Sequence, residues 1–407
     1  MSRVTDSLVW GSILGFCLFS ASFVGADEGV LHFEGSECVM KNWGSAESFG
    51  AKTETFSGHS FYFYLGEKSS QQYPSLSLAL EEHNKNNLNW LKEQRREIVD
   101  KIIPAALKEG TGALSCLPFI RNIDFKLRRA DSKVLSFVES VQTYDLGAHG
   151  YDAKVGHNFD VATGKKIEFS EVIQDKTHLA EILEKKLEKN YPDAMFFGLK
   201  PALRNHVKKE DFSWTLDPQG VTFYFNPYDL APYCEGMLTV TILFKEQPQI
   251  FADKYKSVPE NYCMQLNYYP LRCDLEDDGL VDSLQVVPIE DNQYKIILNN
   301  LTVIDKGDNN TNSVLVHTRN GRNYLYVDSL DEHDNRELHV YDLNTSLPEI
   351  VGKLPYTMRK VKQNDPDTIV SESFPIFSDP DNFTLYDNNK GWIRSFKVSE
   401  NGLPVLE

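Results

Sequence analysis

An amphipathic pattern runs through residues 88–106. Its apolar positions recur at spacings of three, four and seven residues, at Leu88, Leu91, Ile98, Ile102 and Ala106. The charged stretch KEQRRE lies on the opposite face. This period is that of an α-helix with one face against a core, and we expect Gly110 and Gly112 to end the helix.

A second amphipathic helix is predicted to begin near Asp175 or Thr177, because either side chain can cap a helix N-terminus. It is expected to end at the Tyr-Pro-Asp sequence of residues 191–193. Its core-facing positions are Leu179, Ile182, Leu183 and Leu187.

Strand-like stretches precede, separate and follow these helices. They are HSFYFYL (59–65), KVLSFVESVQTYD (133–145), AKVGHNFDVATG (153–164), KKIEFSEVI (165–173), GVTFYF (220–225) and MLTVTILF (237–244). The sequence Thr163-Gly164-Lys165 is typical of a hairpin turn. Helices and antiparallel strands in this order predict an α+β domain, an antiparallel sheet with two amphipathic helices, that ends near residue 250.

From residue 274 onward, short β-type runs alternate with clusters of Asp, Asn and Gly, and no helical period is evident. The clearest runs are residues 294–304, 313–330, 336–344 and 391–406. Asn320-Gly321 predicts a hairpin inside the second of them. An all-β domain follows from this pattern, either a sandwich or a partial propeller-like sheet.

These patterns divide the chain into four parts. Residues 1–26 resemble a signal peptide, residues 27–250 form the α+β domain, and residues 274–407 form the all-β domain. The intervening residues 251–273 are irregular and contain two prolines, so we expect a linker there.

The first residues have the features of an export signal. Arg3 precedes an apolar run, and Val24-Gly25-Ala26 supplies the small residues of a cleavage site. Cleavage would make the mature protein secreted or periplasmic, beginning near Asp27. The alternative is an uncleaved membrane anchor, and this is the one way in which we expect the chain to contact a membrane.

The formal net charge is −17, from 42 Lys and Arg against 59 Asp and Glu. Such acidity argues against nucleic acid as a partner, because phosphates are repelled. It favours either a cationic partner or simple solubility.

Five cysteines lie beyond the signal segment, at Cys38, Cys116, Cys234, Cys263 and Cys273. In an oxidising compartment this odd number suggests one or two disulfides and a spare thiol. We expect a disulfide between Cys263 and Cys273, which enclose a short loop, and Cys38 with Cys116 is the candidate for a second one, while the pairing of Cys38, Cys116 and Cys234 stays open. No CxxC sequence occurs, so neither a thioredoxin-type redox site nor a zinc ribbon is indicated.

The sequence DLEDDGLVD, residues 274–282, is rich in oxygen ligands. Asp274, Glu276, Asp278 and Asp282, with the carbonyl oxygen of Leu280, have a spacing that can wrap a structural calcium ion. Gln285 stands where an EF-hand needs a bidentate acid, so a full EF-hand is not expected. The alternative is an acidic turn in contact with solvent.

No catalytic motif is evident. The chain contains no GxSxG, HExxH or HxxxH sequence, and we expect His149 in a turn and His157 in a strand. The absence favours a binding protein over an enzyme.

Two segments, GAHGYDAKVGHNFDVATGKKIEFSEVI (147–173) and DPQGVTFYFNPYDLAPYCEGMLTVTI (217–242), resemble a bacterial extracytoplasmic family. That family includes the extracellular lysozyme-receptor domain of the anti-sigma-V factor and the non-catalytic N-terminal region of some peptidoglycan deacetylases. The likeness spans roughly residues 30–250. It implies an α+β module outside the cytoplasmic membrane that binds another molecule, and the positions that match its motifs are His149, Gly150, Asn226, Tyr228 and Tyr233.

Two departures from that family limit what the resemblance implies. Seven residues before the apolar run are too few to hold a sigma factor, and nothing resembles the deacetylase catalytic domain. We therefore expect an exported, non-catalytic envelope protein that recognises lysozyme or a peptidoglycan fragment. The alternatives are a cell-wall hydrolase or deacetylase-associated enzyme, and a structural envelope protein without a ligand.

The segment between the strands 220–225 and 237–244 contains Pro227 and Pro232. Each proline fixes φ and removes a backbone donor, so the connection is expected to be a rigid, wide loop. Rigid loops that carry tyrosines are efficient binding surfaces because little entropy is lost on contact. The alternative is that Tyr228 and Tyr233 fold back to seal the core.

Overall fold

The structure is a computed structural model that describes residues 31–46, 51–108, 118–290, 292–307, 312–330, 333, 335–356, 368–371, 380, 383–387 and 392–406. The proposed signal segment, residues 1–26, and Cys116 of the second predicted disulfide lie outside the described residues. Within the described ranges, no helix has both the length and the apolar character needed to cross a membrane.

A six-stranded sheet forms the N-terminal part, with the order β18-β1-β2-β3-β4-β5. Its strands are β1 (Phe33–Ala46), β2 (Ala51–Leu65), β3 (Phe119–Ala130), β4 (Val134–Tyr144), β5 (Tyr151–Asp160) and β18 (Thr368–Ser371). All neighbours are antiparallel except β2 and β3, which run parallel. The prediction of an antiparallel sheet is wrong for this pair, because a helix connects the two strands and returns the chain in the same direction.

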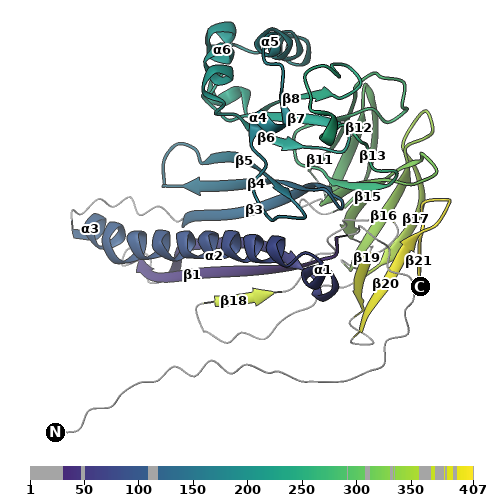
Figure 1. The fold of residues 1–407 in the computed structure, drawn as a ribbon. Coiled ribbons are helices and arrows are strands. Elements are labelled where there is room, and N and C mark those ends of the chain that lie inside the picture. Colours follow the sequence, from purple (N-terminus) through teal and green to yellow (C-terminus); the bar gives the residue numbers. More distant parts are fainter. Residues whose placement is uncertain are drawn as a thin grey trace.

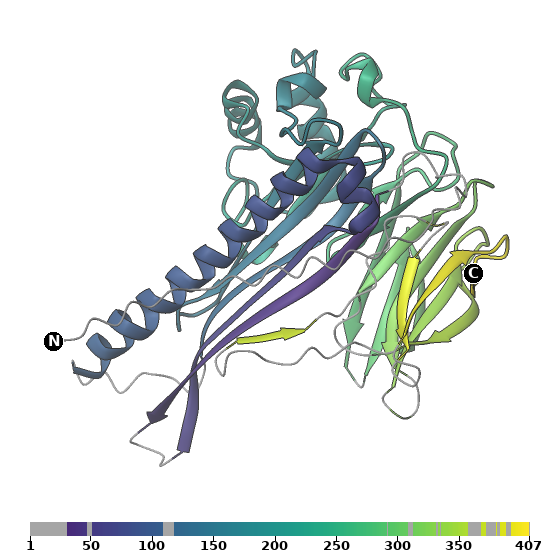
Figure 2. The ribbon, with the colours of Figure 1, turned by 60° about the horizontal axis from the view of Figure 1, so that its bottom comes forward.

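That connection is a long helical segment on one face of the sheet. It consists of α1 (Glu67–Gln72), α2 (Pro74–Glu97), the π-helical turn η1 (Ile98–Ile102) and α3 (Ile103–Lys108). Figure 2 shows α2 lying along the strands. Leu91 and Ile98 are buried as the periodicity predicted, whereas Ile102 is 40% exposed and the helix begins earlier than expected, at Pro74.

A smaller unit of three strands, three α-helices and one short 3₁₀ helix follows β5. It consists of α4 (Phe169–Val172), α5 (Leu179–Asn190), α6 (Leu199–Lys209), β6 (Ser213–Leu216), β7 (Gly220–Phe225), the short helix η2 (Tyr233–Glu235) and β8 (Leu238–Leu243). Leucines of α5 and α6 join the apolar residues of β6–β8 in one core. In Figure 1 the two helices lie side by side above these strands.

Two expectations for this unit are wrong. Residues 165–173 do not form a strand: after an isolated bridge at Lys166, a capping box between Glu168 and Glu171 starts α4 instead. Helix α5 begins after His178, and the Asp175 carboxylate accepts a hydrogen bond from the Thr177 backbone N–H rather than capping the helix.

The predicted linker, residues 251–273, is largely ordered structure. After η3 (Asp253–Tyr255), β9 (Tyr262–Gln265) pairs with β14, and β10 (Leu271–Cys273) pairs with β11. Tyr262 and Met264 of β9 are buried in one core and Cys263 in another. The two prolines of this segment suggested a linker, and nothing in the sequence indicated these buried positions. The C-terminal part therefore begins with β9, inside the segment expected to be a linker.

The C-terminal part is β-rich, as predicted. Its other strands are β11 (Asp282–Ile289), β12 (Gln293–Leu298), β13 (Leu301–Lys306), β14 (Ser313–His317), β15 (Asn323–Leu330), β16 (Arg336–Asp342), β17 (Glu349–Pro355), β19 (Phe383–Asp387), β20 (Trp392–Val398) and β21 (Pro404–Leu406). They form the sheets β10-β11-β12-β13, β17-β16-β15-β14-β9 and β19-β20-β21. The expected hairpin is present between β14 and β15, where Gly321 has φ +71°.

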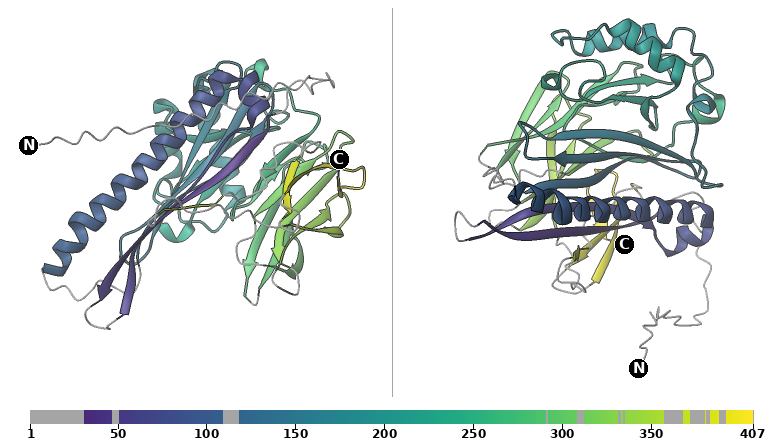
Figure 3. Two further views of the ribbon diagram at one scale, coloured as in Figure 1. Left: turned by 90° about the horizontal axis from the view of Figure 1, so that it is seen from below. Right: turned by 90° about the vertical axis from the view of Figure 1, so that its left-hand side faces the viewer.

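Cores on both faces of the five-stranded sheet hold these layers together. One face packs against β10–β12 and the other against β20 and the segment that follows it. Strand β18 leaves this group and pairs with β1 of the N-terminal sheet (Figures 2 and 3).

The predicted Cys263–Cys273 disulfide is wrong, because Cys273 is a free thiol. Cys273 is buried with Tyr262 and Met264 between two sheets, whereas Cys263 lies in the core on the other face of β9. The alternation of side chains along β9 therefore directs the Cys263 side chain away from Cys273.

Candidate functional site

Two loops that are far apart in the sequence meet at one end of the molecule. The first, residues 145–150, joins β4 to β5, and the second, residues 226–237, joins β7 to β8. The Tyr233 hydroxyl donates a hydrogen bond to the carbonyl oxygen of Gly150 at 2.8 Å. The His149 ring stacks on the Tyr233 ring, with 3.8 Å between centroids and 19° between planes.

The second loop is fixed by its own backbone bonds. The Tyr228 N–H donates to the Ala231 carbonyl and the Asp229 N–H donates to the Asn226 carbonyl, both at 3.0 Å. Asn226 also ties the loop to β5, because its side chain accepts from the Lys154 N–H at 2.6 Å and donates to the Lys154 carbonyl at 3.3 Å. These bonds hold the loop to itself and to β5, and the rigidity expected from its prolines stays a prediction.

Tyr228 and Tyr233 lie close together but differ in environment. Their ring centroids are 5.9 Å apart, and Tyr228 has φ +74° and is 54% exposed, whereas Tyr233 is half-buried beneath His149. A non-glycine residue at positive φ is uncommon and is kept where the surrounding structure holds it. Tyr228 therefore does not seal the core, and Tyr233 serves to join the two loops.

Tyr151 is a further exposed aromatic residue next to Gly150, with 40% of its surface accessible. Partial burial, followed by the negative charges of Asp229 and Asp152, raises the pKa of its hydroxyl. We call His149, Tyr151, Tyr228 and Tyr233 the aromatic surface. Aromatic faces beside carboxylates provide a favourable environment for a cation.

Apolar side chains extend this region onto the segment between α5 and α6. Met195 and Phe197 are 61% and 54% exposed. The Phe197 N–H donates to the Leu230 carbonyl at 2.7 Å, and the Met195 N–H donates to a Glu235 carboxylate oxygen at 3.2 Å. This segment therefore lies directly against the loop that carries Tyr228.

All five residues expected in a ligand site belong to these two loops. The sequence analysis did not single out Tyr151, Met195 or Phe197. Tyr151 could have been found because it directly follows Gly150 in one of the quoted motifs. Met195 and Phe197 could not, because an apolar residue between two helices is as typical of a core as of a surface.

The acidic loop 274–282 is held by bonds to its own backbone. The Asp274 carboxylate accepts from the N–H groups of Asp278 and Gly279, both at 3.0 Å, and Asp282 accepts from the Leu275 N–H at 2.8 Å. Asp278 accepts from the Leu280 N–H, and Glu276 is exposed. These contacts are those of an acidic turn, and calcium binding here stays a prediction.

Among the residues that the structure describes, one group of His and carboxylate side chains has the spacing of a metal site: His83, Glu139 and His157. Burial and the nearby His83 lower the pKa of His157 to about 4. Burial alone would raise the pKa of Glu139, but the hydrogen bonds from His83 and Asn87 hold it below its usual value. At neutral pH the imidazole of His157 is therefore neutral and Glu139 is ionised.

A protein-family model matches the middle of the chain. Residues 169–245 match DUF3298, described as a protein of unknown function. The match spans α4 to β8 and includes the loop of Tyr228 and Tyr233. No curated protein matches the chain.

Two solved structures of DUF3298 family members are similar to this chain. A protein from Bacteroides fragilis is 15% identical, with a TM-score of 0.40, and the likeness covers 56% of this chain and 95% of that one. A protein from Pseudomonas aeruginosa is 14% identical, with a TM-score of 0.33, covering 56% of this chain and 98% of that one. The residues that match DUF3298 lie within the part of the chain, roughly residues 30–250, that we expected to resemble an extracytoplasmic family.

Proposed function

We propose that this chain is an exported, non-catalytic binding protein of the cell envelope, secreted or periplasmic, that recognises a cationic protein such as lysozyme through the aromatic surface. A peptidoglycan fragment is the second ligand that we consider, because sugar rings also stack on aromatic side chains. The observation that carries the proposal is that a hydrogen bond and a His–Tyr ring stack join two loops directly beside the exposed Tyr228.

Pre-organisation supports a binding role. Tyr233, Gly150 and Asn226 hold the loops by the hydrogen bonds described above, so little conformational entropy remains to be lost when a ligand docks. Tyrosines on rigid loops supply a large contact area with few rotatable bonds. The exposed Met195 and Phe197 add apolar area on the adjoining segment.

Charge supports a cationic ligand. The chain carries a formal charge of −17, and the carboxylates of Asp152 and Asp229 lie near the Tyr151 hydroxyl. A basic protein would be attracted by the overall charge, and its Lys or Arg side chains could stack on the tyrosines. The resemblance of the two motifs to a lysozyme-receptor domain suggests lysozyme as the first protein to test.

Calorimetric titration of the full chain with lysozyme at about 50 mM and about 300 mM salt tests the proposal. We expect saturable binding that weakens at the higher salt concentration. Tyr228→Ala should weaken it at least about tenfold, because an exposed aromatic anchor is lost. Tyr268→Ala is the matched control, since Tyr268 is 55% exposed but lies between β9 and β10.

Two results would contradict the proposal. If no heat is released at either salt concentration, lysozyme is not the ligand, and the same titration with soluble peptidoglycan fragments decides whether the second ligand stands. If Tyr228→Ala and Tyr268→Ala bind equally well, the aromatic surface is not where the ligand docks.

A further inference from the structure

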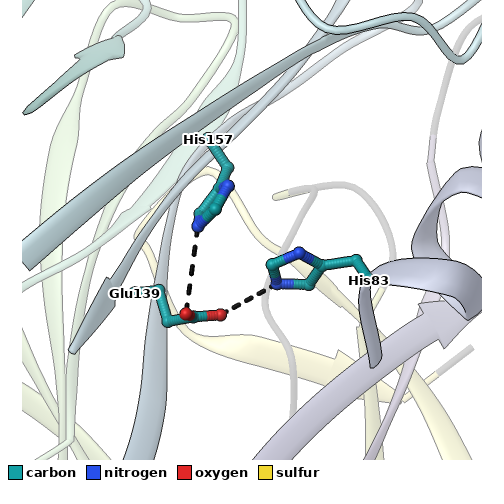
Figure 4. A group of neighbouring side chains, drawn as sticks. All are labelled: His83, Glu139 and His157. Atoms are coloured by element: carbon teal, nitrogen blue, oxygen red, sulfur yellow. Dashed lines mark hydrogen bonds and ion pairs between the residues drawn. The ribbon is translucent and has the colours of Figure 1, made fainter. Parts of the chain in front are cut away.

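Three side chains from different elements meet between α2 and the six-stranded sheet. His83 lies on α2, Glu139 on β4 and His157 on β5, and Figure 4 shows them pointing toward one another. One ligand atom from each residue lies within 4.8 Å of the others. None of these residues belongs to the aromatic surface.

The fold places the three side chains on one side of the sheet. Strand β4 pairs with β5 so that Phe137 lies opposite His157 and Glu139 lies opposite Val155. Side chains two residues apart share a face, and Phe137 packs in the core that contains Leu80 of α2. Glu139 and His157 thus face the helix, and His83, three residues after Leu80, lies above them.

Hydrogen bonds account for only part of this cluster. His83 Nε2 lies 2.8 Å from Glu139 Oε2, and the Asn87 side-chain amide donates to the same oxygen at 2.6 Å. His157 Nε2 is 4.0 Å from Glu139 Oε1, which is too far for a hydrogen bond. This nitrogen is buried and has no hydrogen-bond partner.

Such an unsatisfied nitrogen needs a physical explanation, because a buried polar atom without a partner destabilises the folded state. Aromatic contacts also hold the two imidazoles. The His157 ring stacks on Phe137 at 4.9 Å, and the His83 ring packs against the His157 ring at 4.6 Å. The Nε2 atom of His157 thereby faces the Glu139 carboxylate, at 4.0 Å, which leaves room for an ion between the two groups.

We propose that His83, Glu139 and His157 bind one divalent transition-metal ion, and that Zn²⁺ suits this set of ligands best. Imidazole nitrogens and carboxylate oxygens bind Zn²⁺ at about 2.0–2.2 Å, so the ligand atoms of a tetrahedral site lie about 3.3 Å apart. The separations of 2.8 Å and 4.0 Å in the structure lie on either side of this value. Small side-chain movements would therefore complete the site.

The site lies near the surface and has an open position. The side chains of His83, Glu139 and His157 are 15%, 9% and 12% exposed, so each of them has an edge in contact with solvent although Nε2 of His157 is buried. Three protein ligands leave a fourth tetrahedral position for water or another small ligand. Because the ligands come from α2, β4 and β5, a bound ion would also fasten the helix to the sheet.

The test uses the full chain after dialysis against a chelator. Zn²⁺ binding is followed by calorimetry, and the number of bound ions is determined by elemental analysis. Co²⁺ is then added in place of Zn²⁺, because Co²⁺ in a tetrahedral site absorbs visible light. We expect one ion per chain and a higher melting temperature with Zn²⁺. His157→Gln and His83→Gln should each weaken binding at least about tenfold, whereas the control His178→Gln, at an exposed position, should bind as the unaltered chain does.

Circular dichroism of each variant establishes that it is folded before its affinity is compared. Should His157→Gln fail to fold, His83→Gln gives the answer, because His83 lies at the edge of the cluster and is less buried. The proposal is overturned if the chain binds no stoichiometric Zn²⁺, or if folded His83→Gln binds as tightly as His178→Gln.

Discussion

At the scale of single residues, the most consequential polar contact is a buried ion pair between the six-stranded sheet and the smaller unit of β6–β8. Arg128 of β3 and Asp217, which follows β6, are both 2% exposed, and two guanidinium nitrogens lie 3.1 Å and 2.5 Å from the carboxylate. Burial alone would lower the pKa of Arg128, but Asp217 raises it above its ordinary value. The hydroxyls of Thr215 and Thr222 also donate to Asp217, so the carboxylate is well satisfied.

We predict that Asp217→Asn lowers the free energy of unfolding by about 3–5 kcal/mol, because the charge of Arg128 would stay buried without its partner. Glu181→Gln is the control, since its partner Arg204 is 60% exposed, and it should cost less than about 1 kcal/mol. Urea unfolding of both variants measures the difference. Equal effects of the two substitutions would contradict this account of the pair.

The two quoted motifs have different roles at this scale. In the first, Asp160 accepts from the backbone N–H and the hydroxyl of Thr163, so the Asp-x-x-Thr-Gly sequence is a structural turn. In the second, Tyr228 is exposed at positive φ, which suits a contact surface. The sequence alone identified both motifs but could not separate these roles, because hydrogen bonding and exposure depend on the folded neighbours.

At the scale of elements, the turn after β5 packs against the start of α2. Gly164 has φ +67°, and a Cβ atom at this position would lie 2.3 Å from the carbonyl oxygen of Ser75. Glycine is needed here both for its backbone conformation and for the close approach to the helix.

We predict that Gly164→Ala destabilises the chain by at least about 1 kcal/mol, because positive φ is unfavourable for alanine and the helix would have to move. Gly147→Ala should have little effect, since no atom lies within 4 Å of its Cβ position. Thermal melting of the two variants checks this. If Gly164→Ala leaves the melting temperature unchanged, the close contact between α2 and this turn does not require glycine.

The pattern of apolar residues predicted helices and strands correctly where the periodic pattern continued over many residues. The face of α5 and the strands β7, β8 and β15 follow from the sequence, whereas for α2 the pattern located Leu91 but missed the buried Leu76 and Leu80. It was misleading for residues 165–173, where a capping box outweighed strand-like composition, and for β9, which is only four residues long. Short elements are decided by their tertiary partners, and local composition does not encode these.

At the scale of the whole molecule, the two-part layout is right but the parts are tied together by direct bonds. The Leu127 N–H donates to the Gln265 side chain at 2.7 Å, and the Lys126 ammonium donates to the Asn312 side chain at 3.0 Å. Strand β18 adds to the N-terminal sheet. A sequence-based reading could not foresee these contacts, because their partners are separated by more than a hundred residues in the chain.

The two candidate sites also differ in whether local sequence or long-range contacts define them. The residues of the aromatic surface could be named from two local motifs, since each loop carries its own signature. The cluster of His83, Glu139 and His157 could not, because it requires the register of β4 on β5 and the path of α2 over both. His157 was expected in a strand, without a ligand role.

Hydrogen–deuterium exchange of the full chain with and without saturating lysozyme tests most directly whether the aromatic surface is the binding surface. We predict slower exchange of backbone amides in residues 145–151 and 226–236, and unchanged exchange in β11–β17. Slower exchange confined to the C-terminal sheets, with residues 145–151 and 226–236 unaffected, would contradict the account.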